Sequence, residues 1–441
     1  MGLEVLSLAF LAVYGIVLFY YHHYRENEWQ KALWLVGLIV VGLEAGINTY
    51  NTSIGTVDRA EYLQQIKDYQ RLYEYAGENT EGFFRMEKFD RKTKNDGTLA
   101  GYPTASLFSS TLNSSVADFY EKVGMGHSKV YYAFDGASPL ISAMLNVNYM
   151  YGDTEKREQH EASEYYDKLY APMAESGDIT LYECKYTLPF GFVLPTDYEL
   201  PDTKIMDSLE FQNEMVRRLG IEDNLFISAD VVKDSEDLLL VADRDAYYYA
   251  IAGRGVTEVE MQGSFGTKTY KSLKNNSVMY VGHLKQGNTV YLKNADEDSD
   301  TAFLNLSIYR MDMGVLKEEL YKMSRQHMEN IQYDSTHIAG NITLKEEGKI
   351  FFSVPYEKGW SIYVNDKKTE PELYGECFMT LPLKAGKYEI YMEYQPTGRN
   401  EGIVITICGV ILFLSLGVIQ RRQKETEEIL AEQDSHTDAE I

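Results

Sequence analysis

The sequence is poor in cysteine and proline and contains no low-complexity tract. It has 3 Cys and 10 Pro in 441 residues, while 44% of its residues are hydrophobic. So few cysteines exclude a disulfide framework, and because Cys408 lies inside an apolar run, only Cys184 and Cys377 could pair. The composition also excludes a largely disordered chain, and the length allows two or three domains of roughly 100–200 residues each.

Motifs that would reveal catalytic chemistry or a resident cofactor are also missing. The 8 His form no HExxH motif and no spaced pair with Cys, so we expect no zinc site. Asp296, Asp298 and Asp300 alternate as in a calcium loop, but the glycine and the closing glutamate of that loop are absent. Residues 124–129 lack the glycine spacing of a phosphate loop. We therefore predict no metal and no cofactor, and the catalytic residues remain unknown at this level.

Positive charge is scarce. Lys and Arg number 42 against 67 Asp and Glu, which gives a net charge of −25. A chain this acidic repels phosphate backbones, so we expect no nucleic-acid partner. Tyrosine, by contrast, is abundant at 36 copies, and it favours sheet faces and boundaries between polar and apolar surroundings.

Long apolar runs occur at residues 3–20, 32–47 and 402–419. A helix needs about 20 apolar residues to cross a bilayer core of roughly 30 Å, so we expect three transmembrane helices and the lipid bilayer as a partner. The first run has no basic region before it and no small-residue cleavage site before its charged flank, unlike a secretory signal peptide. Glu44, near the end of the second run, is either a functional intramembrane carboxylate or a side chain that snorkels to the interface.

Basic residues beside these runs predict the orientation. Arg25 and Lys31 lie between the first two runs, and residues 421–424 contain further Arg and Lys directly after the last. Such flanks face the cytoplasm in membrane proteins. We therefore expect the N-terminus outside the cell, an extracytoplasmic domain over residues 51–400, and a cytoplasmic tail over residues 420–441.

The periodicity of apolar residues divides the outer domain into two regions. Helical spacing followed by Gly-, Ser- and Tyr-rich segments predicts a mixed α/β region over residues 51–222. Residues 223–400 contain many short runs of period two separated by turn signals, which predict a β-sandwich with one inserted helix. With two helices in residues 1–50 and one at 402–419, the predicted fold class is membrane-anchored α+β with three transmembrane helices.

Two local predictions concern the β-rich region. Trp360 alternates in register with Ile362 and Val364, which favours a place in the core, although an exposed sugar platform is the alternative for its ring. The inserted helix has Leu316 on its apolar face, and Asp312 can cap its N-terminus.

A stretch rich in hydroxyl groups supplies the candidate binding residues. Tyr102 and Ser106 belong to the polar segment 101–106, and Asp135 follows a cluster of aromatic residues. A pyranose ring offers a hydrogen-bonding rim and an apolar face, which hydroxyl, carboxylate and aromatic groups can recognise. We therefore consider Tyr102, Ser106 and Asp135 as contacts for a sugar or acceptor. The alternative is a turn-rich loop that bonds to its own backbone.

Several longer motifs occur in a fixed order along the chain. They are AGYPTASLFSST at 100–111, DFYEKVG at 118–124, MLNVNY at 144–149, VPYEKGWSIYVND at 354–366, LKAGKY at 383–388 and YQPTG at 394–398. Their order and spacing, with a final apolar helix, resemble the C-terminal half of the bacterial YfhO family of polytopic membrane proteins. The resemblance covers nearly the whole chain and implies a multi-pass protein of the bacterial cell membrane.

The resemblance also implies a function. Members of that family resemble GT-C glycosyltransferases, which move a sugar from a polyprenyl-phosphate carrier to an envelope acceptor such as a teichoic acid. Their catalytic acidic residues belong to early extracytoplasmic loops, and none of them maps onto this chain. We therefore expect a C-terminal or accessory portion of such an enzyme. Its expected partners are a polyprenyl-phosphate sugar or envelope glycopolymer, and a separate polytopic N-terminal half. The alternative is a non-enzymatic, membrane-anchored envelope-binding or scaffold protein.

The predicted topology can be tested by cysteine accessibility in intact cells. A membrane-impermeant thiol reagent should label a cysteine introduced at Ser235, because the basic flanks place that position outside. A cysteine introduced at Ser435 should react only after the membrane is permeabilised. The chain without either introduced cysteine is the control, and labelling at position 435 in intact cells would contradict the orientation.

Overall fold

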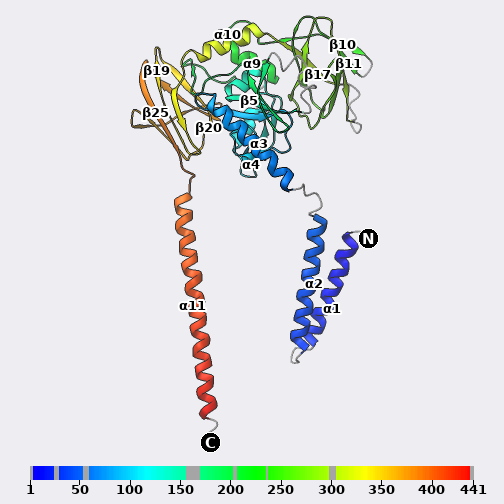
Figure 1. Ribbon diagram of the computed structural model, residues 1–441, viewed down its shortest axis with the longest axis vertical. Helices are drawn as coiled ribbons and strands as arrows, with labels where there is room; N and C mark the ends of the chain where they lie inside the picture. Colours follow the sequence, from blue (N-terminus) through cyan, green and yellow to red (C-terminus); the bar gives the residue numbers. More distant parts are fainter. Residues whose placement is uncertain are drawn as a thin grey trace. The chain divides into compact units, whose positions relative to one another are not determined.

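The chain contains two compact units, Met1–Lys67 and Asp68–Ile441. The computed structural model describes residues 3–23, 29–52, 59–154, 169–201, 206–234, 237–296 and 304–437, and Figure 1 traces them from blue to red. Of the three alternating aspartates that the sequence analysis compared with a calcium loop, Asp298 and Asp300 lie outside the described residues.

The first unit is helical. Helices α1 (Leu3–His23) and α2 (Trp29–Thr52) contact each other along their length, and α3 (Arg59–Glu78) begins in this unit. The hydroxyl of Tyr14 on α1 donates a hydrogen bond to the carboxylate of Glu44 on α2. This bond shows that the Glu44 side chain faces α1. The hydroxyl group of Tyr14 stabilises the carboxylate within the apolar segment.

Two helices in the described part of the chain are long and apolar enough to cross a membrane. These stretches are Lys31–Tyr50 in α2, with 20 residues, and Arg399–Gln423 in α11 (Arg399–Thr437), with 25 residues. The corresponding stretch of α1, Ser7–His23, is shorter. The expectation of three membrane-length helices is therefore corrected to two among the described residues, because the described apolar stretch of α1 is shorter than the roughly 20 residues that a bilayer core requires.

The second unit begins with a mixed region of helices and small sheets. A four-stranded sheet has the order β1-β5-β7-β6, in which β1 and β5 are parallel and the other pairs are antiparallel. A three-stranded sheet has the order β2-β4-β3. The strands are β1 (Arg85–Lys88), β2 (Leu107–Phe108), β3 (Gly126–His127), β4 (Tyr131–Ala133), β5 (Val147–Asp153), β6 (Tyr170–Ser176) and β7 (Ile179–Cys184). The helices are α4 (Asp96–Ala100), α5 (Ser114–Lys122), α6 (Pro139–Met144) and α9 (Ser208–Arg217).

The β-rich region forms two pairs of sheets. In the first pair the strand orders are β10-β11-β16-β13-β14 and β15-β12-β17-β9, and residues of both sheets share one hydrophobic cluster. Its strands are β9 (Phe226–Ser228), β10 (Val231–Asp234), β11 (Asp237–Val241), β12 (Ala246–Ala252), β13 (Val259–Gly263), β14 (Gly266–Tyr270), β15 (Val278–Leu284), β16 (Thr289–Asn294) and β17 (Leu306–Met311).

The second pair of sheets follows α10 (Met313–Ser324) and has its own hydrophobic cluster. The strand orders are β18-β19-β25-β21-β22 and β23-β24-β20-β8. Its strands are β8 (Val193–Leu194), β18 (Glu329–Tyr333), β19 (His337–Leu344), β20 (Gly348–Pro355), β21 (Trp360–Val364), β22 (Lys367–Thr369), β23 (Glu372–Tyr374), β24 (Phe378–Leu383) and β25 (Gly386–Tyr394).

This grouping differs from the predicted single β-sandwich over residues 223–400. Helix α10 separates two sheet pairs, and β8 joins the second pair from the region before residue 222, with Leu194 opposite Lys349. A period of two predicts which residues of a strand are buried, but it does not specify the partner strand. The mixed helical and sheet character of the second unit agrees with the predicted α+β class.

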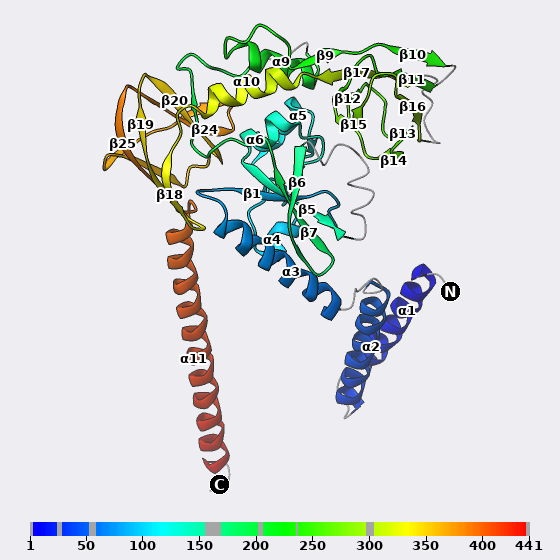
Figure 2. The same cartoon turned by 45° about the horizontal axis from the view of Figure 1, so that its top comes forward.

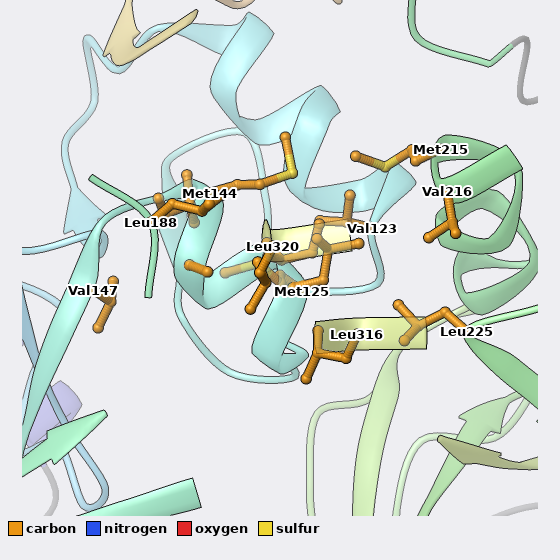
Figure 3. Packing of buried hydrophobic residues seen from close by; sticks show 14 of the residues in the cluster. Val123, Met125, Met144, Val147, Leu188, Met215, Val216, Leu225, Leu316 and Leu320 are labelled. Carbon is orange, nitrogen blue, oxygen red and sulfur yellow. The ribbon is translucent and has the colours of Figure 1, made fainter. Parts of the chain in front are cut away.

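Helix α10 connects the two sheet pairs through a central hydrophobic cluster. Figure 2 shows β17 leading directly into α10. Asp312 caps the helix as predicted, since its Oδ1 accepts hydrogen bonds from the backbone N–H groups of Gly314 (2.8 Å) and Val315 (3.3 Å). Leu316 and Leu320 are buried among side chains of the mixed region (Figure 3).

The strand of Trp360 has the expected parity. Ile362 and Val364 are buried in the second sheet pair, while Trp360 is half-buried at the edge of that cluster. Its ring packs on Tyr394, with 5.1 Å between ring centroids. Trp360 therefore contributes to the border of the core and keeps part of its ring exposed.

Glu319 on α10 is a buried carboxyl group without a hydrogen-bond partner among the described residues. Burial raises the pKa of Glu319 well above its usual range, because the charged form is poorly solvated there. The next residue, Glu318, is exposed and pairs with Lys322 at 3.1 Å. The two neighbours differ only in which face of the helix they occupy.

This contrast predicts a pH-dependent stability. A raised carboxyl pKa stabilises the fold fully below the unfolded pKa of about 4.3, and this contribution is lost as the pH rises toward the folded pKa. Relative to Glu319→Gln, the wild-type protein should lose about 1.4 kcal/mol of unfolding free energy per pH unit over that window. Urea unfolding at several pH values measures this, with Glu318→Gln as the control. Parallel pH profiles for wild type and Glu319→Gln would contradict the prediction.

Candidate functional site

A buried carboxylate organises the hydroxyl-rich segment. Glu87 lies in β1 and is 1% exposed. Its Oε1 accepts hydrogen bonds from the Thr104 hydroxyl (2.5 Å), the Ala105 backbone N–H (2.9 Å) and the Ser106 hydroxyl (2.8 Å). Burying a carboxylate is unfavourable unless donors surround it, and charge-assisted hydrogen bonds of this kind are among the stronger ones in proteins. The hydroxyl groups of this segment therefore bind a side chain of the protein itself.

Arg91 connects this buried carboxylate to the surface. Its Nη1 lies 3.2 Å from Oε2 of Glu87, and its Nη2 contacts the Asp135 carboxylate. The Arg91 side chain is 11% exposed, whereas that of Asp135 is 69% exposed. Burial lowers the pKa of Arg91, but the charges of Asp135 and then Glu87 outweigh it and raise the pKa overall. Glu87 thus holds Arg91, and Arg91 holds Asp135 in place at the surface.

The structure separates the three candidate residues into two groups. Ser106 is buried, and its hydroxyl oxygen also accepts a hydrogen bond from the Phe134 backbone N–H at 3.0 Å. Tyr102 is buried as well, where its ring packs on Tyr151 with 5.1 Å between centroids, and burial raises the pKa of its phenol. Neither side chain can contact a sugar in this arrangement. Asp135 is the candidate that a ligand can reach.

Tyr131 lies within electrostatic range of Asp135, and a second aromatic ring is paired with Tyr131 across the small sheet. Phe108 in β2 stands directly opposite Tyr131 in β4, so the two side chains share one face of the small sheet. Phe108 is 52% exposed, and the Lys94 ammonium lies 4.2 Å from the centroid of the Tyr131 ring. Burial and then the charge of Asp135 raise the pKa of Tyr131. We call Arg91, Lys94, Phe108, Tyr131 and Asp135 the Asp135 surface.

The sequence analysis missed Glu87, Arg91 and Phe108. The available signal was a pair of charged residues, Glu87 and Lys88, inside a strand-like segment, since charges in such a position need partners inside the protein. Lys88 indeed pairs with Asp96 at 3.0 Å, and both side chains are buried. The position of Phe108 opposite Tyr131 depends on strand pairing, which local sequence does not reveal.

The described residues also bear on a metal site, a disulfide and a calcium-like loop. Among the described residues no group of three or more His, Cys, Asp or Glu is arranged to hold a metal ion. Cys184 and Cys377 are both buried and free, so the two do not form a disulfide. Asp296, the described member of the calcium-like loop, accepts a hydrogen bond from the Thr257 hydroxyl.

The linkage from Glu87 to Asp135 predicts unequal mutational effects. Glu87→Gln removes the buried charge that Arg91 pairs with, and breaking a buried pair costs about 3–5 kcal/mol. Asp135→Asn, at the exposed end of the same linkage, should cost about 1 kcal/mol or less. Denaturant unfolding of both variants measures the difference. Equal losses would contradict the view that Glu87 supports the arrangement.

Comparison with solved structures yields only low similarity. A β-glucuronidase of Bacteroides uniformis is 13% identical, matches 36% of this chain and 21% of its own, and has a TM-score of 0.13. A cupin 2 conserved barrel domain protein from Leptotrichia buccalis is 10% identical, matches 40% of this chain and 91% of its own, and has a TM-score of 0.12. Similarity at this level supports no conclusion about fold or activity.

Sequence comparison gives a clear family. A relative from Bacillus subtilis strain 168, described as an uncharacterized protein YfhO, is 21% identical over 411 residues. The match covers 81% of this chain and 47% of that protein, so the chain spans about half the length of its relative. The family model described as bacterial membrane protein YfhO matches residues 3–238 and 243–406. Because this match covers most of the sequence, the chain belongs to the YfhO family of bacterial membrane proteins.

Proposed function

We propose that this chain is the C-terminal or accessory portion of a YfhO-type membrane glycosyltransferase, and that its outer domain contacts a sugar or acceptor at the Asp135 surface. The observation that carries the proposal is an exposed carboxylate held by a buried arginine, within electrostatic range of Tyr131, which is paired across the small sheet with the exposed Phe108. Carboxylate oxygens accept hydrogen bonds from sugar hydroxyls, and an aromatic face packs on the apolar face of a pyranose. Both features occur within one small sheet and its adjoining loops.

Anchoring by α2 and α11 fits this role. Both helices contain membrane-length apolar stretches. The strands of the second unit lie between these two stretches in the sequence. The basic residues beside these stretches favour an extracytoplasmic position for the sheets. A domain in that position meets envelope glycopolymers such as teichoic acids, and also the sugar group of a polyprenyl-phosphate carrier.

The role we propose is contact with substrate and not the transfer reaction itself. The carboxylate of Asp135 is paired with Arg91, and Glu87 is enclosed by its own donors. The chain also spans about half the length of its relative. We therefore place the transfer chemistry in a polytopic N-terminal portion that acts with this domain. The second candidate, an envelope-binding or scaffold protein, shares the same binding surface and lacks any link to transfer.

Binding measurements with the full chain in detergent test this proposal. Phe108→Ala and Asp135→Asn should each weaken binding of a purified teichoic acid about tenfold, which corresponds to about 1.4 kcal/mol. Tyr321→Ala is the matched control, because Tyr321 is 69% exposed and belongs to α10, outside the Asp135 surface. Unchanged affinity in both site variants would contradict the assignment of this surface.

A transfer assay separates the accessory role from an enzyme complete in one chain. The same purified chain should transfer no sugar from a polyprenyl-phosphate donor. Turnover that Asp135→Asn abolishes would show instead that the chain carries its own catalytic centre. If the chain binds substrate without turnover, and turnover appears when an N-terminal portion is added, the chain has an accessory role. A scaffold would bind but would give no turnover with that portion.

A further inference from the structure

A second site is suggested by a cavity at the junction of β7, β12, β17 and α10. Its volume is about 600 Å³, which lies within the range of small-ligand pockets. Lys185 follows β7, Arg244 precedes β12, Arg310 belongs to β17, and Lys317 lies in the second turn of α10. None of the described residues that line the cavity belongs to the Asp135 surface.

The lining is basic in a chain that is acidic overall. Among the described lining residues the cations are Lys185, Arg244, Arg310 and Lys317 and the carboxylates are Asp245 and Asp312, so four positive charges meet two negative ones. The whole chain, by contrast, has a net charge of −25. A concentration of positive charge against that background attracts anions locally.

The nearby carboxylates already have partners within the protein. Asp312 accepts hydrogen bonds from the first turn of α10, and Asp245 accepts one from the Gln286 backbone N–H at 2.7 Å. Asp243, just outside the lining, accepts a hydrogen bond from the Tyr248 hydroxyl at 2.6 Å. Its other oxygen lies 3.2 Å from Nε of Arg310 and 3.4 Å from Nε of Arg244. Counted over the described residues with Asp243 included, the local charge stays positive, at four cations against three carboxylates.

Arg310 is the central residue of this arrangement. Its side chain is 10% exposed, and in β17 it stands opposite Tyr248, whose hydroxyl holds Asp243. Asp243 provides a nearby charge, but the buried Nε of Arg310 makes no hydrogen bond to a described residue. A buried guanidinium with unused donors is unfavourable unless an acceptor meets it, and its planar fork matches two oxygens of a phosphate or carboxylate.

We propose that this cavity binds a phosphate group, with Arg310 as the buried contact and Lys317, Arg244 and Lys185 as the surrounding cations. A phosphate ester carries more charge and more acceptor oxygens than a single carboxylate, so it uses a cluster of four cations better. Tyr186 and Tyr247 also line the cavity and offer apolar surface to the group that carries the phosphate. A sugar or glycerol phosphate belongs to this class, whether it is part of a polymer or of a lipid headgroup.

Phosphate titration of the full chain in detergent tests the site. Lys317→Gln and Arg244→Gln should each weaken binding of inorganic phosphate about five- to tenfold, because each removes one charged partner. Both side chains are exposed enough that folding should not depend on them. Lys322→Gln is the matched control, since it removes the same charge from the same helix outside this cavity and should change affinity less than twofold. Arg310→Lys keeps the positive charge but loses the planar guanidinium group, so it should also weaken phosphate binding. An unchanged melting temperature of this variant shows that it is folded.

The source of the phosphate is distinguished by further ligands. The affinities for a glycerol phosphate oligomer and for vesicles containing phosphatidylglycerol are compared with that for inorganic phosphate. Tighter binding of the oligomer indicates a polymer phosphate, tighter binding of the vesicles indicates a lipid headgroup, and either result supports a phosphate site. Phe108→Ala should leave all three affinities unchanged, so failure of this site and failure of the Asp135 surface give different results. Absence of phosphate binding by the wild-type chain, or equal losses in Lys317→Gln and Lys322→Gln, would overturn the proposal.

Discussion

The second unit depends on one partly buried interaction between segments that are distant in the sequence. Arg85 in β1 donates hydrogen bonds to the Leu145 carbonyl (2.7 Å), the Ser353 hydroxyl (2.8 Å) and the Ser353 carbonyl (2.7 Å). Ser353 in turn donates to Asn146 at 2.6 Å. Burial lowers the pKa of Arg85, which reflects the cost of removing a guanidinium from water, and these acceptors offset that cost. The mixed region and the last sheet pair are joined at this point.

Hydrophobic packing continues from the same junction. Phe351 and Phe378 belong to the second sheet pair, yet they share a cluster with Phe119 of α5, whose ring lies 4.9 Å from that of Phe378. Leu316 and Leu320 of α10 enter the same cluster. The interior of the mixed region therefore includes side chains that arrive more than 200 residues later in the chain. A contiguous core of this kind makes the elements that carry the two proposed sites mutually dependent.

The two proposed sites use opposite arrangements of the same charges. At the Asp135 surface a buried carboxylate, Glu87, holds an arginine that positions an exposed carboxylate. At the phosphate cavity a carboxylate, Asp243, positions two arginines. In each case an ion pair limits the movement of the side chain that meets the ligand, so less conformational entropy is lost when a ligand binds. This ordering explains how a strongly acidic chain can present one carboxylate for hydrogen bonding and one local region of positive charge.

The sequence alone determined what depends on neighbouring residues. It predicted the apolar runs, the Asp312 cap, the parity of Ile362 with Val364, and the family resemblance, because each follows from local spacing or from ordered motifs. It also identified the segment that contains Ser106, although not that the hydroxyl binds Glu87.

Tertiary structure decided what depends on distant pairing. The four sheets in two pairs, the place of β8 and the position of Phe108 opposite Tyr131 all follow from strand partners. The exposure of Asp135, the burial of Tyr102 and the gathering of Arg310 with Lys185 arise in the same way. A local pattern sets which face of a strand or helix is apolar, but the free energy of burial is gained only when that face meets a particular partner. The choice of partner, and with it the location of both candidate sites, belongs to the folded chain.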